Sequence, residues 1–172
     1  MAFHVAYESG VLRHTEHSLD LTYDYESLVI EVCDVLGEAE NGRFTLSGFG
    51  RASWPVSVDY DMSVFLEQLP DLLESLGSGG VFPLDMYAQG TEATLEFAPD
   101  GDHVTITCSS RTAWVPDPDT EHVDRGVLLG MLRELAMGFA LAARTVDPAL
   151  AAVRPFDQWL TWADTSQTQT TS

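Results

Sequence analysis

The densest group of potential ligands in this chain is a set of four carboxylates within eight residues. They are Asp117, Asp119, Glu121 and Asp124. Clustered carboxylate oxygens suit Ca²⁺ or Mg²⁺, but His122 stands where a calcium-binding EF-hand loop needs glycine and Leu128 where it needs glutamate. We therefore predict no metal site and interpret the four acids as partner-binding residues. The alternative is that they precede a helix and complement its dipole.

A second, smaller acidic group flanks Tyr60. Asp59 and Asp61 are both candidates for contact with a partner. The alternative is local, because the Asp61 carboxylate can cap the N-terminus of the helix expected to follow it.

The histidines near the N-terminus do not form a recognisable metal motif. His14, Glu16 and His17 are close in sequence, but a zinc site needs three or four ligands in fixed geometry. The spacing also differs from the His-Glu-x-x-His pattern, so we interpret this segment as a solvated polar loop.

Aromatic and acidic side chains occur together near the C-terminus. Trp159 and Trp162 lie between Asp157 and Asp164. Aromatic residues beside acids are typical of a binding hot spot for a basic protein. The alternative is that this segment packs against its own domain, since aromatics also dominate cores.

The two cysteines, Cys33 and Cys108, both lie in apolar runs that resemble strands. Free cysteine is among the most buried residue types. Two separated cysteines in a chain of this length do not form a disulfide framework, so we expect two buried thiols.

Charge and composition narrow the possible functions. The chain has 27 acidic and 8 basic residues, and its formal net charge is −19. Nucleic acids and anionic membranes are bound through Lys and Arg, so neither is an expected partner, whereas a basic protein is.

Every basic residue is arginine. The absence of lysine excludes a P-loop, a Schiff-base lysine and a Ser-x-x-Lys nucleophile. A salt-adapted surface without a binding role is the alternative explanation of the charge.

The expected elements alternate between strands and helices. Residues 3–7 are predicted as an edge strand, and residues 28–36 and 43–49 as a hairpin joined at Asn41-Gly42, a favourable turn. A third strand is predicted over residues 52–58. Hydrophobic periodicity then predicts a helix from Asp61 to Leu76, with a kink or a break near Leu69 because Pro70 follows. Beyond it we predict a three-stranded meander (82–88, 91–98 and 103–109) and a long helix over 121–145.

These elements predict one α+β domain over residues 1–164, followed by a disordered polar tail over residues 165–172. We expect an antiparallel sheet of about six strands with the helices packed on one face. The N-terminus lacks the pattern of a signal peptide and no apolar run reaches ~18 residues, so a cytoplasmic location is expected.

The absence of catalytic motifs favours a binding protein over an enzyme, and no cofactor is expected. The leading hypothesis is a small acidic module, of the immunity or inhibitor type, that neutralises a basic protein. The alternative is an enzyme or small-ligand carrier with a cavity between sheet and helices, which filling by Phe65, Leu69, Met131 and Leu135 would count against.

Overall fold

The computed structural model describes residues 2–14 and 17–168, and within them the chain forms six strands, four α-helices and one 3₁₀ helix. The α+β class predicted from the sequence is confirmed. In chain order the elements are β1 (His4–Glu8), α1 (Tyr25–Gly37), β2 (Arg43–Ser47), α2 (Asp61–Ser78), β3 (Phe82–Met86), β4 (Ala93–Asp100), β5 (His103–Ser110), β6 (Thr120–Asp124), α3 (Arg125–Val146), η1 (Pro148–Ala152) and α4 (Phe156–Thr168).

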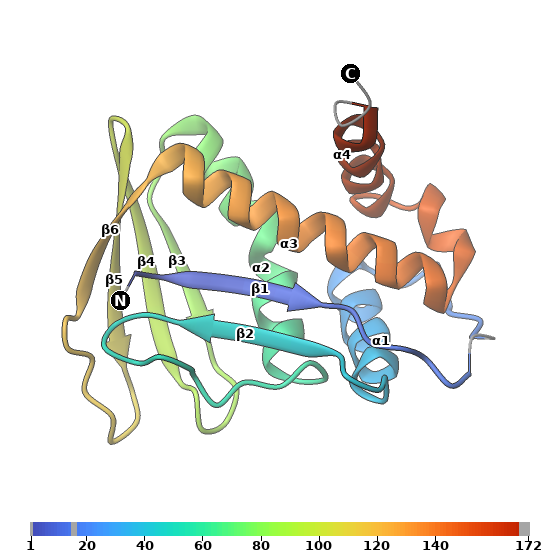
Figure 1. The fold of residues 1–172 in the computed structure, drawn as a ribbon, viewed down its shortest axis with the longest axis horizontal. Coiled ribbons are helices and arrows are strands. Elements are labelled where there is room, and N and C mark those ends of the chain that lie inside the picture. The colour runs from blue at the N-terminus through green and yellow to red at the C-terminus, as the bar shows by residue number, and fades with distance from the viewer. Residues whose placement is uncertain (1, 15–16, 169–172) are drawn as a thin grey trace.

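The strands form two antiparallel sheets rather than the single predicted sheet. One sheet contains β1 and β2, and the other has the order β3-β4-β5-β6. The larger sheet stands at one end of the molecule, and the pair β1–β2 runs from it toward α1 (Figure 1). Instead of sharing one face of one sheet, α3 packs on β1 and α2 packs on β3.

The predicted meander is confirmed as strands β3 to β5. In β4 the side chains of Ala93, Leu95 and Phe97 are buried, and the residues between them are exposed or half-buried. This alternation is what a sheet with one covered face requires. Gly101, with a φ angle of 62°, makes the turn between β4 and β5, a conformation that glycine adopts without strain.

The predicted hairpin strand over residues 28–36 is wrong, because this segment is helix α1. Its buried residues recur at helical spacing: Leu28, Val29, Val32, Cys33 and Leu36. The Asp24 side chain caps the helix by accepting a hydrogen bond from the Ser27 amide. The β-branched residues that suggested a strand carry only a weak preference, which a cap and a buried helical stripe outweigh.

The partner of β2 is therefore β1, with Val5 opposite Leu46. The predicted third strand over residues 52–58 is absent as well. The Trp54 amide donates to the Leu46 carbonyl oxygen at 2.8 Å, but Pro55 has no N–H with which to continue a ladder.

The long C-terminal helix begins later than predicted, because residues 120–124 form strand β6. Glu121 and Val123 are buried while His122 and Asp124 are exposed, which is the alternation of a strand. Val123 lies opposite Val104 of β5. Helix α3 then starts at Arg125, capped by the Asp124 side chain.

Helix α2 continues through Pro70 without the break considered near Leu69, and Gly79, with a φ angle of 80°, caps its C-terminus. Gln68 on this helix covers the outer edge of β3. Its side-chain amide accepts from the Asp85 N–H at 2.8 Å and donates to the Asp85 carbonyl at 2.9 Å. An exposed strand edge invites pairing with other chains, and Gln68 occupies the backbone N–H and carbonyl of Asp85 on this edge.

One continuous apolar core joins both sheets to the helices. Phe65, Leu69 and Leu135 are buried in it and Met131 packs against it, and only a small hollow of about 100 Å³ lies beside Met131 and Leu135, between β1 and α3, among the pockets of the described residues. Among the described helices, α3 is long and apolar enough to span a membrane by length and composition. Core helices of soluble proteins pass the same test.

The last helix, α4, extends through Thr168. Residues 165–168, which the sequence predicted as disordered, are therefore helical. The rest of the predicted tail, residues 169–172, lies outside the described residues.

Both cysteine thiols are free and buried, as predicted. Burial is the main cause that raises the pKa of Cys33, and it raises the pKa of Cys108 to about 12. We expect neither thiol to react with a disulfide reagent in the native protein at a pH of about 8, and both to react in denaturant. Rapid labelling of either thiol in native buffer would contradict this burial.

The same shifts have a consequence for stability. A thiol ionises near its ordinary pKa of 9.0 in the unfolded chain but only at higher pH in the folded protein. The free energy of unfolding should therefore fall as the pH rises above this value, as denaturant titrations at alkaline pH can measure.

Candidate functional site

The four acids predicted to bind a partner do not converge in space. Asp117, Asp119 and Asp124 are exposed, whereas Glu121 is only 7% exposed. Asp124 is occupied as the cap of α3, accepting from the Val127 amide at 2.9 Å. Within residues 2–14 and 17–168, no three His, Cys, Asp or Glu side chains are placed to hold a metal ion.

Glu121 instead supports a strained loop at residues 48–50. Its Oε1 accepts a hydrogen bond of 2.6 Å from the Phe49 amide, while its Oε2 is buried without a hydrogen-bond partner among the described residues. Phe49 has a φ angle of 56°, a conformation that is rare for a bulky residue. Asp117 also contacts this loop, since its amide donates to the Phe49 carbonyl at 3.2 Å.

The predicted pair Asp59 and Asp61 is divided between surface and interior. Asp59 is exposed, and Asp61 is 6% exposed. Asp61 does not cap α2 but lies at its first position, where Oδ2 accepts from the Ser57 amide at 2.8 Å and Oδ1 from the Thr91 hydroxyl at 2.7 Å. It therefore ties the start of α2 to the turn before β4.

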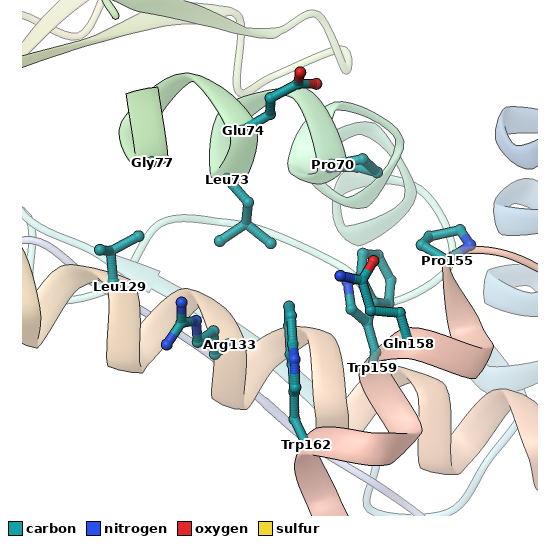
Figure 2. Close-up of a pocket in the computed structure, with 10 residues that line it drawn as sticks. All are labelled: Pro70, Leu73, Glu74, Gly77, Leu129, Arg133, Pro155, Gln158, Trp159 and Trp162. Atoms are coloured by element: carbon teal, nitrogen blue, oxygen red, sulfur yellow. The ribbon is translucent and has the colours of Figure 1, made fainter. Parts of the chain in front are cut away.

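The two C-terminal tryptophans also differ. Trp159 is 2% exposed and packs edge-on against Tyr25 and Phe156. Trp162 is half-buried, and its ring centroid lies 5.5 Å from the Arg133 guanidinium. Both line a groove of about 380 Å³ between α2, α3 and α4 (Figure 2).

Most arginines of the described chain are engaged locally. Four form ion pairs, which are Arg13–Glu40, Arg43–Glu8, Arg111–Asp85 and Arg154–Asp157. Arg125 donates to carbonyl oxygens at the end of α2, and Arg51 lies over the Trp114 ring at 4.2 Å. The surplus carboxylates consequently have few cations with which to pair.

One stripe of exposed side chains, with the half-buried Glu67 among them, combines such carboxylates with tyrosine. Tyr60, Glu67, Asp71 and Glu74 recur at helical spacing at the start and along α2, so they lie on one side of the helix. None of these acids forms an ion pair within the described residues. Together with Tyr87, whose hydroxyl donates to Glu67 Oε1 at 2.6 Å, these residues form what we call the acid–tyrosine surface.

The tyrosines of this surface are accessible. Tyr60 is 52% exposed and Tyr87 is 47% exposed. Partial burial, the hydrogen bond to Glu67 and the negative groups nearby raise the pKa of Tyr87. Its phenol therefore stays protonated and holds the Glu67 carboxylate in place.

Sequence reasoning missed this surface. The spacing of Tyr60, Glu67 and Asp71 was a usable signal, since a helix was predicted there. The part played by Tyr87 could not be predicted from the sequence, because its contact with Glu67 depends on how β3 packs on α2.

Comparison with known protein families, with curated proteins and with solved structures finds no match for this chain.

The two aspartates around Tyr60 make a matched pair for mutation. We expect Asp61→Ala to lower the free energy of unfolding by about 2 kcal/mol, because the half-buried Ser57 amide loses its acceptor and the Thr91 hydroxyl keeps only the Ala88 carbonyl. Asp59→Ala, at an exposed position, should change it by less than about 0.5 kcal/mol. Denaturant titration measures both, and equal effects would show that Asp61 is not a structural residue.

A second pair tests the support of the strained loop. We expect Glu121→Ala to destabilise the protein by about 2 kcal/mol, because the Phe49 amide loses its buried acceptor. Asp119→Ala, exposed in the same segment, should have little effect. Hydrogen exchange at Phe49 provides a local measure: it should accelerate in Glu121→Ala alone, and unchanged protection would refute the assigned role.

Proposed function

We propose that this protein is a small acidic binding module that neutralises a basic protein partner, as an immunity or inhibitor protein does. The proposal rests chiefly on the acid–tyrosine surface, where carboxylates that form no ion pair among the described residues lie beside two exposed tyrosines. The partner class is a protein with a cluster of arginines or lysines.

The charge of the whole molecule supports this partner class. At −19 the protein attracts cations from a distance, and complementary charge accelerates diffusional encounter. The exposed Asp117, Asp119 and Asp124, the residues predicted from the sequence, contribute to this field from the other edge of the larger sheet. The same field disfavours a nucleic acid or an anionic membrane.

The two tyrosines add binding energy that exposed charges alone do not provide. An exposed ion pair is worth roughly 0–1 kcal/mol, so carboxylates on a solvated helix attract many cations weakly. Tyrosine is enriched at binding hot spots because its ring buries a large area at little entropic cost. Tyr87 also holds Glu67 through a hydrogen bond, which presents one carboxylate in a fixed position.

The surface can be tested with a defined cationic probe, a nona-arginine peptide, by isothermal titration calorimetry at low and moderate salt. The double variant Glu67→Gln/Asp71→Asn removes two charges from the surface. We expect it to raise the dissociation constant about tenfold, equivalent to roughly 1.4 kcal/mol.

The matched control is Glu96→Gln/Asp100→Asn, which removes two charges from the outward-facing positions of β4. It should raise the dissociation constant by less than about twofold, the effect expected of a change in net charge alone. Equal weakening by the two double variants would show that the peptide responds only to total charge and that the acid–tyrosine surface is not the site. No binding at low salt would contradict the proposed function itself.

A further inference from the structure

The groove between α2, α3 and α4 has the size of a small-ligand site. Its volume of about 380 Å³ lies within the roughly 300–1,000 Å³ typical of pockets for small molecules. The walls are mainly apolar and come from all three helices and the segment before α4: Pro70, Leu73, Leu129, Pro155, Trp159 and Trp162.

Polar groups are few, and one of them is a cation. Arg133 extends from α3 into the groove between Leu129 and Trp162, opposite Leu73 of α2 (Figure 2). Glu74 also lines the groove, but its carboxylate points away from Arg133. Among the described residues Arg133 forms no ion pair, although acidic residues outnumber basic ones by 27 to 8 in this chain.

The guanidinium of Arg133 donates no hydrogen bond to another side chain or carbonyl of the described residues, so its N–H groups are available to a ligand. This guanidinium lies 5.5 Å from the Trp162 ring centroid, close enough for a cation–π attraction. A guanidinium has five N–H donors in a planar fork, which matches the two oxygens of a carboxylate.

From this geometry we propose that the groove binds a small aromatic carboxylate. The carboxylate pairs with Arg133, and the aromatic ring lies between Leu73 and Leu129 on one side and Trp162 on the other. This site is separate from contact with a basic protein and does not depend on it. It also differs from a cavity between sheet and helices, since no strand residue lines the groove.

The acidic surface does not prevent such binding. At physiological ionic strength the Debye length is about 8 Å, so distant carboxylates are largely screened. The local balance is set by Arg133, which attracts the ligand, and by Glu74 at the rim, which repels it.

The test uses naphthoate and its neutral analogue naphthamide as probes. Calorimetry measures the affinity of each probe. The indole N–H signals of Trp159 and Trp162 in NMR spectra show whether the probe binds in the groove. Naphthoate should bind saturably and shift both indole signals. Arg133→Gln should weaken naphthoate binding at least tenfold and leave naphthamide binding unchanged. Arg144→Gln, a matched loss of charge on the same helix outside the groove, should have no effect.

Two further variants test whether the shape of the guanidinium matters and whether the groove is separate from the acid–tyrosine surface. Arg133→Lys retains the charge without the planar fork and should give an intermediate affinity, provided that its spectrum is otherwise that of the native protein. Glu74→Gln should tighten naphthoate binding severalfold and weaken the arginine peptide, so one substitution separates the groove from the acid–tyrosine surface. Absence of saturable naphthoate binding, or equal affinity for naphthamide, would overturn the proposal.

Discussion

Burial of the apolar face of α3 is the interaction on which the rest of the molecule depends. Leu128, Leu132 and Phe139 are fully buried, and the helix contacts β1, α2 and α4. Each such side chain contributes roughly 1.5–3 kcal/mol relative to an exposed one, whereas repulsion between exposed carboxylates is weakened by salt. A core of this kind tolerates a heavily charged surface, so the carboxylates along α2 and the neighbouring Tyr60 and Tyr87 can serve in binding.

The parts of the fold that could be predicted are those encoded by local pattern. In β4 and β5 the alternation of apolar and polar residues and the intervening Asp100-Gly101 determine the meander without reference to the rest of the chain. Strand β6 differs because Val123 is ordered by pairing with Val104, a contact between distant positions that no short window displays. For residues 28–36 the helical stripe was present in the sequence, but β-branched residues suggested a strand, a preference worth at most about 1 kcal/mol.

The candidate sites were harder to predict because closeness in sequence is not closeness in space. Strand alternation sends Glu121 inward and Asp124 outward, which separates acids that appear as one cluster in the sequence. The buried carboxylate of Glu121 also departs from the general expectation that glutamate is exposed. The hydrogen bond from the Phe49 amide accounts for its position. The acid–tyrosine surface and the groove both depend on packing between helices or between α2 and β3, so they emerge only from the folded structure.

The negative net charge of the protein therefore does not mean that every local site on it binds a cation. On α2, Glu74 belongs to a stripe of carboxylates and also borders the groove that contains Arg133. Arg133 forms no ion pair among the described residues, and unlike Arg144 it lines a groove and lies near an aromatic ring, that of Trp162. An aromatic ring orients a guanidinium without satisfying its donors. Long-range attraction of cations and short-range capture of an anion can thus coexist on neighbouring sides of one helix, because the first depends on total charge and the second on geometry within a few ångströms.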